Sequence, residues 1–114
     1  DGLKGGERMQ AILNCFTRMR FVDKKTAELD FKQKEDIGSA PKHLIPWFEY
    51  SKRPMAGTPI CFGHWSMLGL IRRDDIVAID TGCLWGGKLT AVRFPDRRIY
   101  QEDCPCWADP FKYK

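Results

Sequence analysis

The sequence predicts an α/β fold, with an N-terminal helix, a loop-rich middle and C-terminal strands that include a hairpin. Three patterns support this prediction: a helical apolar period near the start, closely spaced prolines and glycines over residues 32–58, and apolar runs of strand length over residues 59–101. A chain of 114 residues can bury one core but not two, so we expect residues 1–114 to belong to a single domain.

The helix is predicted over residues 7–21. Its apolar residues recur at three- and four-residue steps and therefore share one stripe: Met9, Ile12, Leu13 and Phe16. Arg18 and Arg20 fall in the last predicted turn, where positive charge suits the negative end of the helix dipole. The helix dipole thus accounts for both arginines without any ligand.

The middle of the chain is expected to be irregular. Residues 27–31 alternate between apolar and charged side chains and predict a short extended segment. Residues 32–58 then combine a charge run with several prolines and glycines, although residues 43–50 could form one helical turn that holds an aromatic anchor. Such a long irregular segment is either functional or a covering flap, and both interpretations stay open.

Strands dominate the predicted C-terminal half. Residues 59–62 and 76–79 are apolar runs short enough to be buried strands, and residues 66–70 predict a helical turn or a loop between them. Residues 88–94 alternate, pass through a Pro-Asp-Arg turn and return over residues 98–101, which predicts a hairpin.

The composition excludes several classes of protein. Hydrophobic residues make up 43% and charged residues 30% of the chain, which is typical of globular proteins rather than disordered tails or coiled coils. No apolar run approaches the ~20 residues of a membrane span. The net charge of +4 is spread along the chain, so it gives no strong nucleic-acid signal.

The five cysteines argue against a disulfide framework, because their number is odd and their spacing irregular. The pair Cys104 and Cys106 lacks the second pair or nearby histidine that would complete a zinc site. Free thiols are typical of a reducing compartment, so we expect a cytoplasmic protein.

Two segments could carry chemistry. His64 directly follows the strand predicted at residues 59–62, and open α/β sheets bind ligands at the carboxyl ends of their strands. Considered alone, His64 is either a metal ligand or a structural histidine. Asp80, Thr81 and Gly82 resemble the half-site of retroviral-type aspartic proteases, which are homodimers with a shared pair of carboxylates. That likeness covers few residues, and the sequence after Gly82 departs from the protease pattern.

Four longer segments match a different family in their order and spacing. They are residues 14–21 (Asn-Cys-Phe-Thr-Arg-Met-Arg-Phe), 46–48 (Pro-Trp-Phe), 62–66 (Phe-Gly-His-Trp-Ser) and 80–91 (Asp-Thr-Gly-Cys-Leu-Trp-Gly-Gly-Lys-Leu-Thr-Ala). Together they resemble the carboxyl-terminal part of the bacterial symmetrical bis(5'-nucleosyl)-tetraphosphatases, which are phosphoprotein-phosphatase-like metallophosphoesterases. The resemblance runs over residues 3–100, and residues 80–91 are its most specific part.

The resemblance implies a fold and an activity. The fold would be part of a metallophosphoesterase α/β sandwich with mixed sheets. The activity would be symmetrical hydrolysis of diadenosine tetraphosphate to two molecules of ADP. Family members use two divalent metal ions, commonly manganese or cobalt, which lower the pKa of a bridging water and neutralise phosphate charge. The implied partner is therefore a small-molecule dinucleotide, with no membrane involved.

The resemblance also suggests roles for individual residues, although it gives none that is certainly catalytic. His64 matches the last metal-binding histidine of the family. Arg18 and Arg20 match its Thr-Arg-Met-Arg segment, and a guanidinium can hold a phosphate with two hydrogen bonds. Three further residues are expected on loops that face the cleft, and either tryptophan could stack on adenine: Trp65, Gly82 and Trp85. Asp80 is a weaker candidate, because its segment is not one of the family's main metal motifs.

The family's other signatures are absent from this sequence, which contains no Gly-Asp pair. Those signatures supply most metal ligands and the general acid. We therefore expect the chain to be the carboxyl-terminal portion of a longer enzyme, inactive alone, with the missing N-terminal part as its partner. Two alternatives remain: a non-catalytic nucleotide-binding module, and an aspartic protease homodimer built on Asp80.

Overall fold

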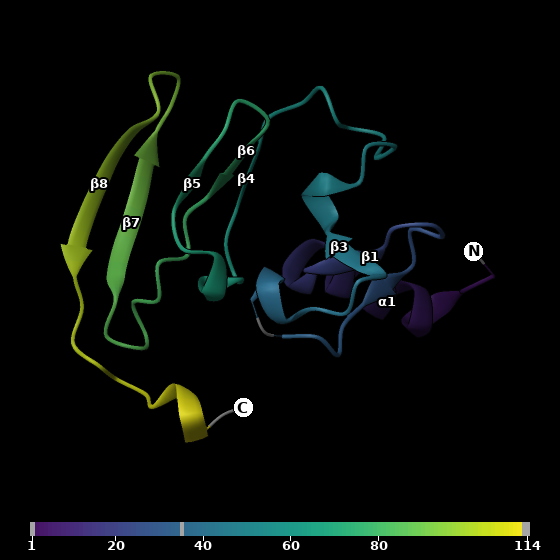
Figure 1. Cartoon of the computed structure of the whole chain (residues 1–114), viewed down its shortest axis with the longest axis horizontal. Helices are drawn as coiled ribbons and strands as arrows, with labels where there is room; N and C mark the ends of the chain where they lie inside the picture. Colours follow the sequence, from purple (N-terminus) through teal and green to yellow (C-terminus); the bar gives the residue numbers. More distant parts are fainter. Residues whose placement is uncertain (1, 35, 113–114) are drawn as a thin grey trace. The chain divides into compact units, whose positions relative to one another are not determined.

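The structure is a computed structural model that describes residues 2–34 and 36–112. The chain divides into two compact units, Asp1–Ala56 and Gly57–Lys114, here called unit 1 and unit 2 (Figure 1). The described residues combine one α-helix with antiparallel and mixed sheets, so the predicted α/β class is confirmed. No helix in the described part of the chain is long and apolar enough to cross a membrane.

Unit 1 combines one helix with a small antiparallel sheet of order β2-β1-β3. Its regular elements are α1 (Gly5–Arg18), β1 (Phe21–Asp23), β2 (Leu29–Asp30) and β3 (Leu44–Pro46). The helix ends three residues before the predicted boundary at residue 21, because Met19 is already extended and leads into β1. Phe21 and Val22 are buried in that strand, which the sequence pattern did not reveal.

The irregular part of unit 1 contains two 3₁₀ turns, η1 (Ile37–Ser39) and η2 (Trp47–Glu49). The second turn confirms the predicted aromatic anchor, but the predicted helical turn over residues 43–50 is limited to residues 47–49, because residues 44–46 form β3. Trp47 and Phe48 are both buried, and their rings meet edge to face with centroids 5.5 Å apart. η2 follows β3 directly, and its two aromatic rings belong to the buried core.

Unit 2 contains a small mixed sheet of order β4-β6-β5. Its strands are β4 (Ile60–Phe62), β5 (Ile71–Arg72) and β6 (Ile76–Ala78), with the 3₁₀ turn η3 (Ser66–Leu68) between β4 and β5. β4 and β6 are parallel, whereas β5 and β6 are antiparallel. All of β6 is buried, as its continuous apolar run predicts. β5 was not predicted, because two residues are too few to show a period.

The predicted hairpin is confirmed, with its first strand one residue shorter and its second strand two residues longer than expected. β7 (Lys88–Arg93) and β8 (Arg98–Asp103) pair antiparallel over their whole length (Figure 1). The Arg97 guanidinium in the hairpin turn donates to the backbone carbonyls of Arg73 (2.7 Å) and Asp74 (3.1 Å). These bonds hold the turn of the hairpin against the turn between β5 and β6. A last 3₁₀ turn, η4, covers Pro110–Lys112.

Candidate functional site

The candidate site in unit 2 lies where the parallel strands β4 and β6 end. Parallel strands place their carboxyl ends at the same edge of a sheet, and this is where open α/β sheets bind ligands. The Ile79 amide donates to the Phe62 carbonyl (3.0 Å), which holds the two strand ends together. A Cβ at Gly63 would lie 3.9 Å from the Cβ of Asp80, so the segments that follow the strands are in contact distance.

His64 stands at this edge with an exposed side chain and an unusual backbone. Its φ angle is +72°, in the left-handed region that is costly for a residue other than glycine. The next residue, Trp65, is 2% exposed and belongs to the core of unit 2. Burial of Trp65 therefore fixes the backbone that presents His64 to solvent. Because its ring lies in the core, Trp65 has no open face on which a base could stack.

The loop after β6 is folded tightly on itself. The Asp80 carboxylate accepts from the Gly82 amide (3.1 Å), and Gly82 has a φ of +77° that favours glycine. Gly87 has no room for any side chain, because a Cβ there would lie 2.2 Å from the Thr81 carbonyl oxygen. Trp85 is half-buried, and its ring lies 3.7 Å from where a Cβ at Gly82 would stand.

A polar network centred on the buried Thr90 joins this loop to the hairpin. The Thr81 hydroxyl donates to the Lys88 carbonyl and lies 2.5 Å from the Thr90 hydroxyl, which also accepts from the Gln101 amide (3.1 Å). Thr90 is the buried polar residue of β7. Sequence reasoning missed this network, although the alternation of β7 did place Thr90 on one face of the strand.

A disulfide links the same loop to the end of the hairpin. Cys83 and Cys104 are bonded, with their Cα atoms 5.2 Å apart. The prediction that the cysteines form no disulfide framework is therefore wrong for this pair. The reason is that the hairpin returns residue 104 beside the loop, so a separation of 21 residues in sequence becomes contact in space. Cys15, Cys61 and Cys106 are free.

The described residues offer few potential metal ligands that lie close together. Among residues 2–34 and 36–112, no group of three or more His, Cys, Asp or Glu side chains could hold a metal ion. His64 and Asp80 share one edge of the sheet, but they do not form a closed site. His64 presents an exposed imidazole, a side chain that can ligate a divalent metal ion.

The predicted arginines lie in unit 1, at the point where α1 passes into β1. Arg18 donates to the Asn14 side-chain oxygen (3.4 Å) and lies over the Phe31 ring, 5.9 Å from its centroid. Arg20 is half-buried, and its Nε has no hydrogen-bond partner among the described residues. Burial, together with the charge of Arg18, holds the pKa of Arg20 below its usual range. Within the described part of the chain, neither guanidinium forms an ion pair.

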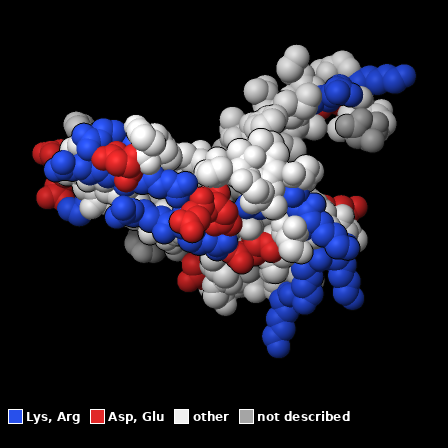
Figure 2. Space-filling view, turned by 90° about the horizontal axis from the view of Figure 1, so that it is seen from above, with Lys and Arg blue, Asp and Glu red and all other residues white. Residues whose placement is uncertain are grey.

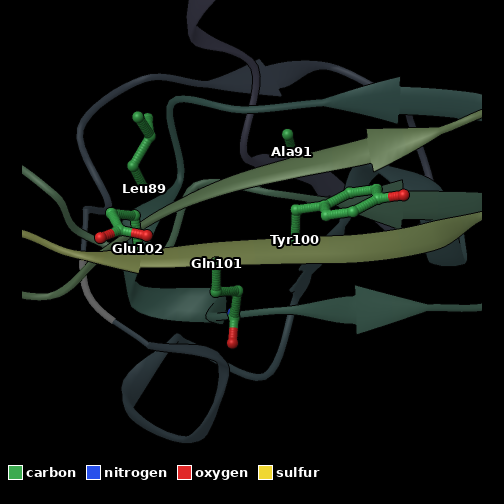
Figure 3. Close-up of a pocket in the computed structure, with 5 residues that line it drawn as sticks. All are labelled: Leu89, Ala91, Tyr100, Gln101 and Glu102. Atoms are coloured by element: carbon green, nitrogen blue, oxygen red, sulfur yellow. The ribbon is translucent and has the colours of Figure 1, made fainter.

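Unit 2 also has a hollow on the outer face of the hairpin, with a volume of about 270 Å³ (Figure 3). Its lining residues come from both strands: Leu89, Ala91, Tyr100, Gln101 and Glu102. Tyr100 lies beneath the guanidiniums of Arg93 and Arg98, at 5.9 Å and 5.2 Å from its ring centroid. This hollow contains none of the predicted site residues.

The charged side chains do not gather into one stripe on the face shown in Figure 2, where Lys and Arg alternate with Asp and Glu. Two arginines in the described part of unit 2 are paired with nearby carboxylates. Arg73 contacts Asp75 (2.8 Å), and Arg93 contacts Asp96 (2.5 Å). Such local pairing lowers the net positive potential available to a polyanionic nucleic acid.

Comparison with known proteins gives a consistent result. No family model matches the chain. Bis(5'-nucleosyl)-tetraphosphatase, symmetrical, of Chromobacterium violaceum is 46% identical over 109 residues, which cover 96% of this chain and 39% of that protein. The protein of the same name from Dechloromonas aromatica is 45% identical over 113 residues, covering 98% of this chain and 41% of its own length. The chain thus spans about two-fifths of the length of these curated relatives.

A solved structure supports the same likeness. The crystal structure of a candidate diadenosine tetraphosphatase superposes with a TM-score of 0.54 and 25% sequence identity. The match covers 76% of this chain and 36% of that one. The chain is therefore similar in sequence, over nearly its whole length, to part of the symmetrical tetraphosphatases, and over 76% of its length it is similar in fold to part of this diadenosine tetraphosphatase structure.

Proposed function

We propose that this chain is the carboxyl-terminal portion of an enzyme that hydrolyses diadenosine tetraphosphate symmetrically to two molecules of ADP. The observation that carries the proposal is the 46% identity to a symmetrical tetraphosphatase across 96% of the chain. The chain spans 39% of that relative, so the remaining catalytic groups would lie in the part of the enzyme that it does not include.

His64 is the proposed metal ligand of this portion. Its side chain is exposed at the edge where two parallel strands end, and the buried Trp65 fixes its backbone. An imidazole nitrogen is a common ligand of divalent transition metals. A bound pair of such ions, manganese or cobalt, would supply a water of lowered pKa and offset phosphate charge. The other ligands would come from outside the described residues.

Arg18 and Arg20 are the proposed phosphate-binding residues. The two guanidiniums lie close enough for the charge of Arg18 to lower the pKa of Arg20. Neither has a carboxylate partner among the described residues. An anion bound between them would remove this repulsion. A planar guanidinium also offers paired N–H donors that match the oxygens of a phosphate. Binding of the tetraphosphate chain is thus the role that their charges support best.

Trp85 is the proposed contact for an adenine base, with Gly82 giving the backbone room beside it. Trp85 is half-buried in the loop that follows β6, whereas Trp65 is enclosed in the core. Stacking on an exposed ring face is sequence-tolerant for nucleobases and needs no further hydrogen bond.

The test of the proposed function uses the two histidines of the chain as a matched pair. In the complete enzyme with manganese, we expect His64→Ala to lower kcat/KM for diadenosine tetraphosphate by roughly 100-fold or more, since a metal ligand is lost. His43→Ala removes an exposed imidazole from unit 1 and should stay within about twofold of the parent. Formation of ADP, measured by chromatography, reports the rate. Equal effects of the two variants would contradict the proposed ligand role.

The same assay distinguishes the proposed function from the two alternative hypotheses. Tight binding of diadenosine tetraphosphate without metal, and no hydrolysis by the complete protein, would indicate a nucleotide-binding module instead. The comparisons give no support to an aspartic protease. The relatives match this chain across the segment that contains Asp80, and they are named as tetraphosphatases. Robust turnover by the 114-residue chain alone would contradict the view that it is only a portion of the active enzyme.

A further inference from the structure

Helix α1 is amphipathic, but its apolar side is not the side that packs on its own unit. Its partly buried residues are small or polar and share one side: Ala11, Asn14 and Cys15. Arg18 continues this side and lies over the Phe31 ring. The large apolar residues lie on the opposite side and are exposed: Met9, Ile12, Leu13 and Phe16, here called the apolar stripe.

The exposure of the apolar stripe is large for a folded protein. Phe16 is 86% exposed and Met9 62%, and no residue of α1 is buried. A surface helix normally turns its apolar stripe toward the core and its polar side toward solvent. A contiguous exposed apolar patch of this kind marks a surface that another body covers. The orientation of α1 therefore implies a partner that unit 1 does not supply.

We propose that the apolar stripe of α1 is the docking surface for the part of the phosphoesterase domain that this chain does not contain. This inference rests on the proposed function, because it takes the occupant from the same relatives. About three-fifths of the length of those relatives lies outside the matched region. In a continuous chain, that part would be present at high effective concentration beside α1, which favours it over a separate partner.

Docking on this stripe would also place the arginines. Arg18 is the last residue of α1, and Arg20 lies two residues later, directly before β1. If the rest of the domain packed on the apolar stripe, it would fix the axis of α1 and hence the position of the two guanidiniums near its carboxyl end. The apolar contact would thereby hold the proposed phosphate-binding residues in register with groups contributed by the rest of the enzyme.

The test compares two double variants in two proteins. Met9→Glu with Phe16→Glu places charge in the stripe, whereas Gln10→Glu with Thr17→Glu places the same charges one position later and about 100° around the helix. Glutamate is a good helix former, so all four changes keep α1 intact. The first protein is the 114-residue chain. The second is the Chromobacterium violaceum relative with this chain in place of its matched 109 residues.

We expect the stripe variant to have different effects on the melting temperatures of the two proteins. In the 114-residue chain, the stripe variant should keep the parent's melting temperature and bind less of an apolar dye, since it replaces exposed apolar surface. In the chimera, the same variant should lower the melting temperature by roughly 10 °C or prevent folding, while the control variant matches the parent. Thermal unfolding and light scattering give these readouts without any measurement of activity.

Three results would overturn the inference. One is a chimera that tolerates both variants equally. Another is a 114-residue chain that forms a stable dimer which the stripe variant dissolves, because the occupant would then be a second copy. A third is loss of folding by the stripe variant in the short chain itself. A chimera that shows the expected melting behaviour but hydrolyses no diadenosine tetraphosphate would leave the docking inference standing and refute the proposed function.

Discussion

Helix α1 carries an apolar stripe and strand β6 is apolar throughout, yet the stripe is exposed and the strand is buried. Ile76, Val77 and Ala78 of β6 are almost completely enclosed, whereas the apolar stripe of α1 faces outward. β6 is the central strand of its sheet, with β4 and β5 on either side. The helix has only one side against its unit. An apolar pattern therefore predicts that a surface will be covered, but the pattern alone does not identify the segment that covers it.

The largest expected effect comes from placing the same charge in each element. Val77→Asp buries a carboxylate in the centre of β6 and should lower the free energy of unfolding by about 4 kcal/mol or more, which is enough to unfold unit 2. Leu13→Asp in the exposed stripe should cost about 1 kcal/mol or less in the 114-residue chain. Urea titration followed by circular dichroism measures both values, and similar costs would break the comparison.

Two tryptophans of unit 2 extend the comparison to single side chains. Trp65→Ala removes a fully buried ring and should destabilise the chain by about 3–5 kcal/mol. Trp107 is 75% exposed, so Trp107→Ala should change the free energy of unfolding by about 0.5 kcal/mol or less. Chemical unfolding of the two variants under identical conditions provides the test. A small effect of Trp65→Ala would show that this ring does not support the loop that carries His64.

A smaller effect is expected from the backbone of His64. Because its φ of +72° is unfavourable for a residue with a Cβ, His64→Gly should be about 1 kcal/mol more stable than His64→Ala. Both variants lack the imidazole and should be equally impaired in the complete enzyme. The melting temperatures of the two variants isolate the conformational term, and equal values would indicate that the backbone is not left-handed in solution.

The smallest effect concerns the turn between β1 and β2. Backbone hydrogen bonds from Thr26 and Lys25 hold the pKa of the Asp23 carboxyl below its usual range. A folded-state pKa below the unfolded value means that the carboxylate contributes stability above the unfolded pKa and loses it as the pH falls through the folded one. Asp23→Asn should therefore melt with a weaker acid dependence than the parent below about pH 4. Parallel melting curves from pH 7 to pH 2 for both proteins would contradict this.

Much of the fold followed from the sequence because the relevant signals are local. The continuous apolar run of β6 and the alternation around a turn in β7 and β8 specify their elements directly. β1 and β5 did not follow, since two or three residues are too short to show a period and their pairing is decided by distant strands. The disulfide between Cys83 and Cys104 was missed for the same reason, because it depends on where the hairpin returns the chain.

The candidate site was predicted in part. The position of His64 at a strand end follows from the apolar run before it, and the structure adds that β6 ends at the same edge. The enclosure of Trp65 could not be read from its neighbours, because glycine and histidine on one side and serine on the other are typical of an exposed loop. Which side of α1 faces its own unit was equally invisible, since an amphipathic pattern is expected to turn its apolar stripe inward.

The parallel pairing of β4 with β6 also has a consequence for the order in which the chain folds. The two strands of the β7–β8 hairpin are close in sequence, so they can meet within microseconds. β4 and β6 are separated by a crossover that contains η3 and β5. Closing that loop costs chain entropy before the contacts between the two strands can stabilise it. We therefore expect the hairpin to form early and the edge that presents His64 to be among the last parts of unit 2 to take shape.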